Sequence, residues 1–405
     1  MKSALPLLFI AAVSLHAAAP PTLPPGVVNT QRPEDRPLPP AEALARLTPP
    51  PGFQVTAFAG EPDLRQPIAF DFDDRGRLWV IENFSYPDFQ HEDQDRVVIF
   101  TDRDGDGRFD ERQVFLENGH RLSGLTIGFG GVWLASTPNL LFVPDANGDD
   151  RPDGPAQVLL DGWTTNAGHN LMNGLAWGPD GWLYGRHGIT APSFVGRPGA
   201  PDSERVKVSC GIWRYHPVTR RFEMVVNGTT NPWGLDWDED GQAFFSNNVL
   251  VHLWPLIPGA HFRRMFGEDP DPHVYALLET CADHKHFAGN DWTKSRGGQG
   301  EHDALGGGHS HSGAMIYQGD NWPDEWRGAI FMGNIHGNRV VFDRLERRGS
   351  GYIATHGGNF MKARDPWFRP ITVACGPDGG VFVSDWNDYG ECHDLDGSYR
   401  DSGRL

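Results

Sequence analysis

A repeated pair of short apolar runs joined by a tight turn constrains the fold of this chain more than any other feature. In each copy, apolar residues alternate with others, a turn with Gly or Asp follows (Pro-Asp-Gly or Glu-Asp-Gly in three copies), and a second run carries an aromatic residue. Alternation with a period of two is typical of strands, and these turn residues favour hairpins. The copies lie at 67–80, 122–134, 173–184, 232–245, 311–332 and 370–383.

The spacing of the copies predicts an all-β fold, a six-bladed β-propeller. Intervals of roughly 50 to 80 residues fit propeller blades better than solenoid repeats of about 20 to 45 residues. The segment 53–58 is expected to add a strand to the last blade and close the ring. The insertion at 259–308, rich in His, Asp and Gly, is expected at one mouth of the central channel. An irregular β-sandwich whose copies resemble one another by chance is the alternative.

The first 50 residues are predicted to lie outside the propeller. Lys2, the apolar run 5–13 and the small residues after it have the layout of a secretory signal peptide over residues 1–19. Residues 20–50 are rich in proline and predict an extended linker, so the propeller domain is expected over 51–405. The apolar run is shorter than the roughly 20 residues that span a bilayer. We therefore expect a periplasmic or extracellular protein without membrane insertion.

Composition and missing motifs exclude several functions. The chain has 53 acidic and 35 basic side chains and a net charge of −18, so nucleic acid is not an expected partner. It has no dinucleotide-binding glycine fingerprint, phosphate loop or Gly-x-Ser-x-Gly elbow, which removes the usual support for nicotinamide, phosphoryl-transfer and α/β-hydrolase chemistry. Four cysteines allow one or two disulfides in an oxidising compartment, and their pairing stays open. They are Cys210, Cys281, Cys375 and Cys392.

Two acidic loops predict calcium binding. In the first, carboxylates alternate in the Asp-x-Asp-x-Asp-Gly pattern of calcium loops, since Ca²⁺ prefers six to eight oxygen ligands. Gln113 stands where an EF-hand has its bidentate glutamate, so the loop is not an EF-hand. The second loop is a weaker copy, and either loop could be an acidic β-turn without a metal. The predicted ligands are Asp102, Asp104, Asp106, Asp110, Asp145, Asn147, Asp149 and Asp153.

Histidine is abundant, with 17 in the chain. Several fall at corresponding edges of successive repeats, where they would line one channel mouth and could act as general bases or metal ligands. A single loop histidine is more often a surface or hydrogen-bonding residue, and no His-Glu-x-x-His zinc spacing occurs. The histidines concerned are His169, His187, His284, His286, His302, His309, His311, His336 and His356.

Several short segments carry a family resemblance. They lie at 82–87, 102–110, 178–185, 231–234, 311–318 and 365–370. Together they resemble the membrane-bound dehydrogenase N-terminal domain family of Planctomycetes and Verrucomicrobia, from about residue 50 to the C-terminus. That family is similar in turn to the soluble quinoprotein glucose dehydrogenases, six-bladed propellers that bind pyrroloquinoline quinone (PQQ) and Ca²⁺ at the channel mouth.

The resemblance implies roles for particular residues. In the quinoprotein enzymes a histidine before the third repeat takes the substrate hydroxyl proton as hydride passes to the quinone, and His169 stands within about one residue of that place. Asn231 belongs to a segment similar to one that contacts the cofactor, although Thr230 stands where an arginine is expected. Trp233 could stack on a flat cofactor and Arg369 could bind an anionic one. Blade packing and ordinary structural contacts are the alternatives for these two.

The leading functional hypothesis is an exported quinoprotein-like oxidoreductase domain. It would oxidise a sugar or alcohol with PQQ and pass electrons to a partner such as a cytochrome. The first alternative is a calcium-dependent, lactonase-type hydrolase in which Ca²⁺ at the channel mouth polarises a carbonyl. The second is a non-catalytic propeller that binds carbohydrate or protein. Because propellers host all three functions, the fold does not decide between them.

Overall fold

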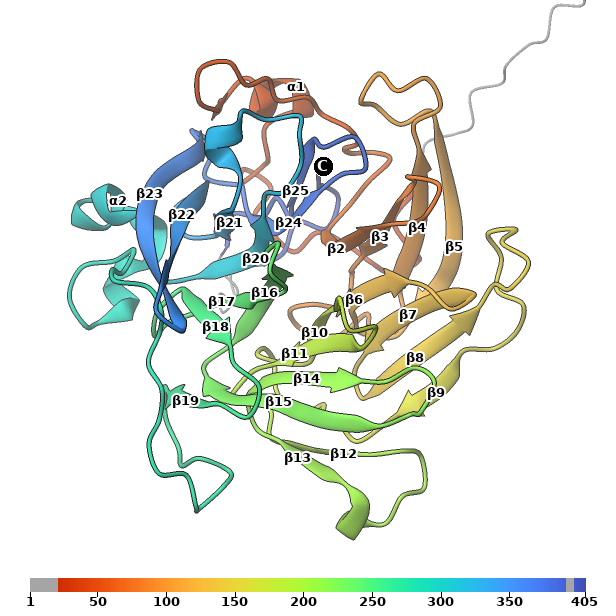
Figure 1. The fold of residues 1–405 in the computed structure, drawn as a ribbon. Coiled ribbons are helices and arrows are strands. Elements are labelled where there is room, and N and C mark those ends of the chain that lie inside the picture. Colours follow the sequence, from red (N-terminus) through yellow and green to blue (C-terminus); the bar gives the residue numbers. More distant parts are fainter. Residues whose placement is uncertain (1–20, 391–396) are drawn as a thin grey trace, which may run out of the picture.

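The structure is a computed structural model that describes residues 21–390 and 397–405. Nearly all regular structure in these residues is β-strand, which confirms the predicted all-β class (Figure 1). The short helical segments are α1 (Pro40–Leu44), α2 (Glu301–Leu305), η1 (Asp202–Glu204), η2 (Trp292–Gly298) and η3 (Asp324–Trp326). No helix in the described residues is long and apolar enough to cross a membrane. The predicted signal peptide at 1–19 lies outside these residues.

The strands form sheets that follow one another along the chain, each mainly antiparallel. The first sheet has β2 (Pro67–Phe72), β3 (Leu78–Glu82), β4 (Asp95–Thr101) and β5 (Glu111–Gly119). The second has β6 (Leu122–Ile127), β7 (Gly131–Ser136), β8 (Asn139–Pro144) and β9 (Gln157–Leu160). The third has β10 (Asn173–Trp177), β11 (Leu183–His187), β14 (Gly211–Tyr215), β15 (Phe222–Thr229) and the parallel β19 (His261–Arg264).

The remaining sheets are one small hairpin and three sheets built mainly from the second half of the chain. The hairpin is β12 (Ser193–Val195) with β13 (Val206–Val208). The fourth sheet has β16 (Pro232–Trp237), β17 (Ala243–Asn247) and β18 (Leu253–Leu256). The fifth has β20 (His311–Ile316), β21 (Ala329–Asn334), β22 (Arg339–Arg348), β23 (Gly351–Ala363) and β1 (Leu47–Thr48). The last has β24 (Pro370–Cys375) and β25 (Val381–Asp385).

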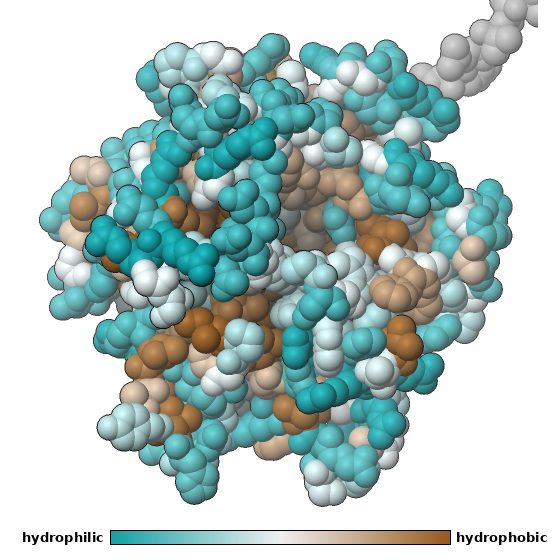
Figure 2. All heavy atoms as spheres, in the orientation of Figure 1, coloured by the Kyte–Doolittle hydropathy of each residue, from teal (hydrophilic) through white to brown (hydrophobic). Residues whose placement is uncertain are grey.

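The sheets are arranged around a central axis in the manner of a β-propeller (Figure 1). The first strand of each predicted repeat lies nearest the axis, and each contacts the first strand of the next repeat, in the order β2, β6, β10, β16, β20, β24. Strand β24 in turn contacts β2. The face seen in Figure 2 is largely hydrophilic and is hollowed near this axis, where apolar side chains are visible.

Glycines allow the innermost strands to approach closely. A Cβ atom on Gly234 of β16 would lie 2.1 Å from the backbone carbonyl carbon of Gly313 in β20. The same holds between Gly124 of β6 and Gly174 of β10, where the nearest backbone atom would be 2.6 Å away. Side chains at these positions would push neighbouring sheets apart, because non-bonded carbon atoms pack at about 3.5 to 4.0 Å.

The two ends of the described chain meet in the last sheet. Asp385 at the end of β25 pairs with Arg404, and Arg404 pairs with Gly60 on its other side. Phe58 N donates to the Leu405 carbonyl at 2.8 Å. The segment 53–58, predicted to add a strand to the last sheet, is not a strand; the backbone contacts that join the two ends lie at 58–60 instead.

Residues 21–50, predicted to be a linker, lie against the sheets at several points. Leu47 and Thr48 pair with the edge of β23, and the Leu38 carbonyl accepts a hydrogen bond from Arg404. Phe53 then packs edge-on against Trp322 and Phe360, with ring centroids 5.0 and 5.2 Å away.

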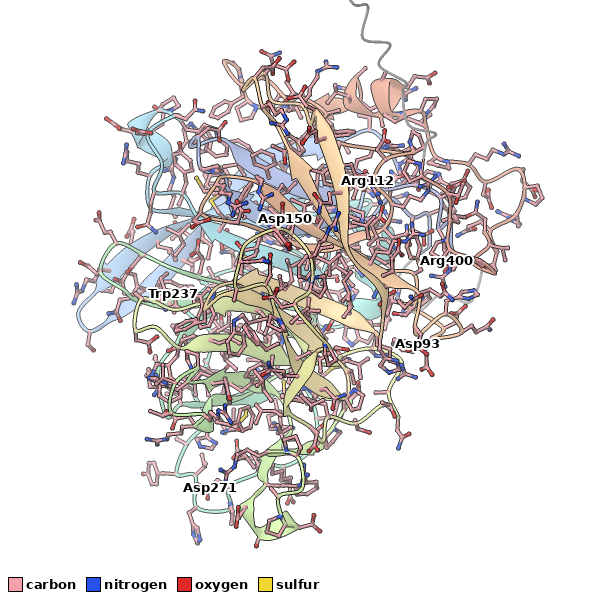
Figure 3. The ribbon with its side chains drawn as sticks, turned by 90° about the vertical axis from the view of Figure 1, so that its right-hand side faces the viewer. Asp93, Arg112, Asp150, Trp237, Asp271 and Arg400 are labelled. Atoms are coloured by element: carbon pink, nitrogen blue, oxygen red, sulfur yellow. The ribbon has the colours of Figure 1, made fainter. Side chains whose placement is uncertain are left out.

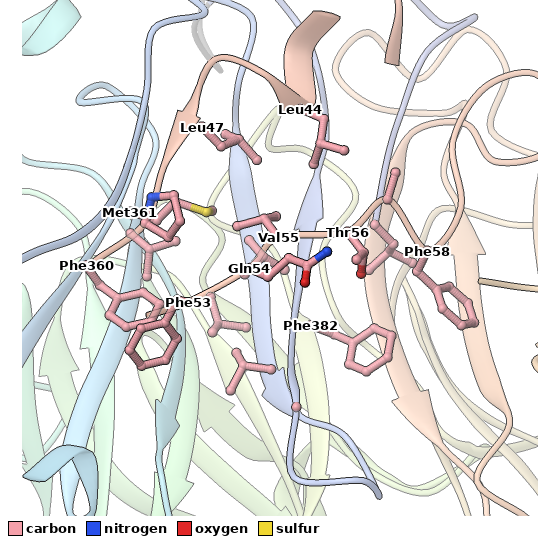
Figure 4. Close-up of a pocket in the computed structure, with 18 of the residues that line it drawn as sticks. Leu44, Leu47, Phe53, Gln54, Val55, Thr56, Phe58, Phe360, Met361 and Phe382 are labelled. Atoms are coloured by element: carbon pink, nitrogen blue, oxygen red, sulfur yellow. The ribbon is translucent and has the colours of Figure 1, made fainter. Parts of the chain in front are cut away.

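A cavity of about 510 Å³ lies between this N-terminal segment and the last two sheets. Figure 4 shows its mainly apolar wall, with Phe53, Val55, Phe360 and Phe382 around it. We regard this cavity as a gap in the packing of the N-terminal segment, since the residues predicted for chemistry line a different one.

The described cysteines are not paired. Cys210, Cys281 and Cys375 are free thiols, and Cys392 lies outside the described residues. Burial raises the pKa of both Cys210 and Cys281 to about 12, so these two thiols are protonated at neutral pH.

Candidate functional site at one mouth of the channel

The innermost strands begin around one mouth of the channel, and a cavity of about 370 Å³ lies there. Its wall is drawn from every repeat, including residues at or just before the start of each innermost strand. These are Ile68, Ser123, Met172, Asn231, Ser312 and Ile371. The volume suits a small molecule rather than a macromolecule.

A second cavity, of about 670 Å³, lies at the other mouth, along the later residues of the same strands. Trp233 lines both cavities and therefore lies between them. Arg186 lines only this second cavity, where burial lowers its pKa to about 10. Its Nε and Nη1 atoms have no hydrogen-bond partner among the described residues.

A repeated local contact holds the loops around the first cavity. The second strand of several repeats ends in a buried polar residue that accepts backbone N–H groups from the loop before the innermost strand. Asn247 Oδ1 accepts from Thr230 N at 3.1 Å and from Asn231 N at 2.8 Å. Asp385 Oδ1 accepts from Arg369 N at 2.8 Å. Each loop then enters a strand that begins with proline, whose missing N–H leaves no donor unpaired there.

All four residues predicted for catalysis and cofactor binding line this cavity: His169, Asn231, Trp233 and Arg369. They come from three different loops and one innermost strand, so the fold brings them together from distant positions in the sequence. His169 is half-buried, and its backbone carbonyl accepts a hydrogen bond from Thr190 Oγ1 at 2.7 Å. This contact fixes the loop that carries the imidazole at the cavity wall.

Three buried polar side-chain atoms of cavity-lining residues have no partner among the described residues. They are Thr137 Oγ1, Thr230 Oγ1 and Asn231 Oδ1. A buried acceptor or hydroxyl without a partner costs free energy, typically about 1 to 3 kcal/mol. Groups of this kind fit a ligand that supplies hydroxyls.

The arginines of the wall are already engaged by other groups. Arg369 donates to the backbone carbonyls of Pro366 and Tyr389, each at 2.7 Å. Arg121 forms an ion pair with Glu92 at 2.7 Å and stacks on the Phe89 ring, 4.3 Å from its centroid. These contacts hold both guanidinium groups in structural roles.

The electrostatics of the wall bear directly on a carboxylate-bearing quinone cofactor. Thr230 occupies the place where the family resemblance expects a cofactor-contacting arginine. Asp388 also lines the cavity, and burial raises its pKa to about 6, so it adds negative charge at neutral pH. The described wall therefore does not fit PQQ through its arginines, and we derive no step through that cofactor.

Several residues of the wall were not anticipated from the sequence. Five of them are aromatic and come from the loop after β3, from the long insertion and from the segment after β25. They are Tyr86, Phe89, Phe266, Trp292 and Trp386. Asp388 was also missed. It lies three residues after the end of β25, outside the repeated segment, so the repeat pattern did not indicate it.

The predicted calcium loops form compact acidic turns. Carboxylate oxygens of Asp102, Asp104 and Asp110 lie within 4.8 Å of one another. In the second loop, Arg77 forms an ion pair with Asp150 at 2.6 Å, and Asp150 is labelled in Figure 3. That guanidinium already supplies positive charge to the second loop, whereas the three carboxylates of the first are close enough to share one ion.

The other histidines divide into separate groups. His309 lines the cavity, and its Nδ1 lies 2.7 Å from Ser295 Oγ. His187 is buried and is not part of the cavity wall; it contacts the Ala191 carbonyl at 2.6 Å, and burial lowers its pKa to about 4. His284, His286 and His356 lie close together outside the cavity.

The fold and this cavity together define a β-propeller with a small-molecule cavity at one mouth of its channel. The chain belongs to the family described as a domain of unknown function, DUF7133, whose profile matches residues 39–392. No curated protein matches the sequence significantly.

Several similar solved structures have descriptions that name dehydrogenases of sugars. A candidate oxidoreductase (glucose dehydrogenase) from Thermus thermophilus is 18% identical, with a TM-score of 0.55 over 87% of this chain and 99% of that chain. PQQ-bound aldose sugar dehydrogenase from Streptomyces coelicolor is 15% identical, with a TM-score of 0.54 over 89% and 96%. The PQQ domain of pyranose dehydrogenase from Coprinopsis cinerea is 14% identical, with a TM-score of 0.51 over 84% and 94%. At these identities the likeness shows the fold alone.

Proposed function

We propose that this chain is an oxidoreductase-type propeller that binds a sugar or another hydroxyl-bearing small molecule in the channel-mouth cavity. The observation that carries the proposal is the convergence of His169, Asn231 and Trp233 on one cavity. Amide and hydroxyl groups can hydrogen-bond to the hydroxyls of a sugar, and aromatic faces can pack against its C–H groups. The sugar dehydrogenases that share the fold support this class of ligand.

In this proposal each polar group has a separate task. Asn231 Oδ1 and Thr230 Oγ1, which lack partners among the described residues, orient hydroxyls of the ligand. His169 accepts the proton of the hydroxyl that reacts, since an imidazole is the side chain best suited to general base work near neutral pH. Trp233 forms the floor against which the ligand rests.

A second candidate is a propeller that binds the same ligand without oxidising it. The engaged guanidinium groups of Arg121 and Arg369 favour this candidate, because a carboxylate-bearing quinone would need positive charge that these groups give to other contacts. Hydrolysis of a lactone that requires Ca²⁺ would instead identify the chain as the calcium-dependent hydrolase.

The test is a titration of the full chain with a panel of sugars and alcohols, read by tryptophan fluorescence and calorimetry. We expect saturable binding at millimolar or lower concentration, weakened in Trp233→Ala and unchanged in the exposed control His273→Ala. If PQQ with Ca²⁺ and a dye acceptor then gives turnover that is lost in His169→Ala, the chain is an oxidoreductase. Binding without turnover supports the second candidate, and no binding by the folded protein contradicts both.

The variant Thr230→Arg separates the cofactor question from the ligand question. It restores the arginine that the family resemblance expects beside Asn231. If PQQ binds the variant far more tightly than the wild-type chain, the natural protein has lost a quinone contact. Equal binding by both would mean that other groups hold the quinone.

Five finer points belong to the same proposal. The contacts that run from β2 around to β24 and back support six blades. The narrower kinship with the membrane-bound dehydrogenase domains of Planctomycetes and Verrucomicrobia rests on the motifs. Export to the periplasm or cell exterior rests on residues 1–19, and a cytochrome would be the electron acceptor. Calcium at Asp102, Asp104, Asp106 and Asp110 would be structural.

A further inference from the structure

Three histidine nitrogens and one carboxylate oxygen converge on a single point beside the fifth sheet. The residues are His284 and His286 from the long insertion, Asp343 from β22 and His356 from β23. His286 Nε2 lies 3.1 Å from His284 Nε2 and 3.0 Å from His356 Nδ1. Asp343 Oδ1 lies 3.4 Å from the His284 atom, 3.8 Å from the His286 atom and 3.7 Å from the His356 atom.

These five separations are close to the edge length of a coordination tetrahedron, which has six edges. Zinc binds imidazole nitrogen at about 2.0 to 2.1 Å and carboxylate oxygen at about 2.0 to 2.2 Å, so tetrahedral ligand atoms lie about 3.4 Å apart. The five separations above span 3.0 to 3.8 Å, on either side of that value. The four atoms therefore surround a space that one small cation could occupy after modest shifts of the side chains.

Neighbouring groups orient three of the four candidate ligands. His284 Nδ1 lies 2.9 Å from Asp283 Oδ1, a carboxylate that accepts its proton and leaves the Nε2 lone pair directed at the common point. His286 Nδ1 lies 2.7 Å from His311 Nε2, which can accept in the same way. Metal-bound histidines generally donate their second N–H to such a partner.

The aspartate is oriented by a further histidine. His252 Nε2 lies 2.7 Å from Asp343 Oδ2, and both side chains are buried. That contact uses one carboxylate oxygen and turns Oδ1 toward the three imidazoles. The Asp343 side chain is fully buried, and its Oδ1 atom has no hydrogen-bond partner among the described residues. An unpartnered buried carboxylate oxygen costs free energy unless a cation meets it.

We propose that His284, His286, Asp343 and His356 bind one divalent transition-metal ion, with Zn²⁺ as the expected occupant. Three imidazoles and one carboxylate suit zinc, whereas Ca²⁺ and Mg²⁺ prefer oxygen ligands throughout. Four protein ligands fill a tetrahedral shell, which is typical of structural rather than catalytic zinc. This site is separate from the acidic loops and from the channel-mouth cavity.

The position of the site shows what the ion would do. Asp343 and His356 face each other across β22 and β23, while His284 and His286 belong to the insertion that follows β19. The ion would therefore fasten the insertion to the fifth sheet. Phe266 and Trp292, which lie in the same insertion, line the cavity. Metal binding would thus hold one wall of the proposed ligand site in place.

The test begins with metal analysis of the full chain, purified without a histidine tag and dialysed against Zn²⁺ at neutral pH. We expect one equivalent of zinc, and after replacement by Co²⁺ the intense visible absorption of a tetrahedral cobalt site. His356→Gln changes the most exposed ligand, 29% exposed, and should fold while binding zinc at least about 100-fold more weakly. His273→Ala, an exposed histidine in the same insertion, should keep both the stoichiometry and the spectrum.

Two results would overturn the proposal. One is less than a small fraction of an equivalent of zinc in the folded wild-type chain. The other is the same zinc stoichiometry and cobalt spectrum in His356→Gln as in the wild type. A lower melting temperature after chelation, in wild type and His273→Ala but not in His356→Gln, would support it, because an ion that binds only the folded state stabilises it. None of these readouts depends on enzymatic activity.

Discussion

Arg404 is the side chain through which the ring closure can be tested most directly. Its Nη2 and Nε donate to the two carboxylate oxygens of Glu61 at 2.9 and 3.2 Å, and its Nη1 lies 3.9 Å from Asp385 Oδ2. The Arg404 and Glu61 side chains are only 10% and 18% exposed. Truncating one partner of such a pair leaves a charge largely buried without its counterion, at a cost of about 3 to 5 kcal/mol. We expect Arg404→Met to lower the free energy of unfolding by about that amount at pH 8.

The cost should depend on pH, and the sign follows from Asp385. Burial raises the pKa of Asp385 to about 6, and Arg404 opposes that shift. Without Arg404 the folded-state pKa rises further, whereas the unfolded-state pKa is unchanged. At pH 5 the Asp385 carboxyl is mostly protonated in both folded proteins, so Asp385 adds little to the loss at that pH and the Glu61 pair accounts for most of it. Above both folded-state pKa values the variant loses about 1.4 kcal/mol more for each unit of the rise.

Urea unfolding followed by tryptophan fluorescence at pH 5 and pH 8 measures both effects. Arg348→Met is the matched control, because Arg348 is 67% exposed and lies 3.5 Å from Glu346. Such a surface pair contributes at most about 1 kcal/mol, at either pH. The reasoning fails if Arg404→Met costs no more than this control, or if its cost is the same at both pH values.

Two further predictions concern the inner ring and calcium. Gly234→Ala should lower the melting temperature by about 5 °C or more, because its Cβ would lie 2.1 Å from the Gly313 backbone. Gly154→Ala is the control, since a Cβ there would have no atom within 4 Å. Equal melting temperatures of the two variants would contradict the prediction. Asp102→Asn should weaken calcium binding, measured by calorimetry, at least about tenfold, while Asp145→Asn leaves the first-loop binding heat unchanged. No heat with the wild-type chain would refute calcium there.

Much of the fold could be predicted because the hairpin repeats carry local signals. Alternating apolar residues and turns with Asp and Gly marked the pairs β2–β3, β10–β11 and β24–β25, and each forms in the structure. The pairing of β1 with β23 could not be found in this way. Leu47 and Thr48 form a two-residue strand, and nothing in the local sequence indicates that they pair with the edge of β23.

The residues of the candidate sites also differ in how far the local sequence could predict them. His169 and Asn231 could be selected because they precede recognisable repeats, and they share one cavity. The histidine cluster could not be assembled, since zinc motifs are recognised by regular spacing along one segment. Here Asp343 and His356 become neighbours only through the register of β22 and β23. The His-x-His pair at His284 and His286 was the one local signal, and it is too short to stand alone.

The meeting of Arg404 with Glu61 also sets the order in which the molecule can fold. These residues are 343 positions apart, so the last sheet cannot be completed until almost the whole chain is available. Contacts of such sequence separation are formed late and slow folding, because chain entropy must be lost before they contribute. Until then β25 presents an open edge, the kind of surface that pairs with other chains. Yield on refolding should therefore fall with protein concentration, and variants that loosen this junction should aggregate before they lose the hairpins of the first sheets.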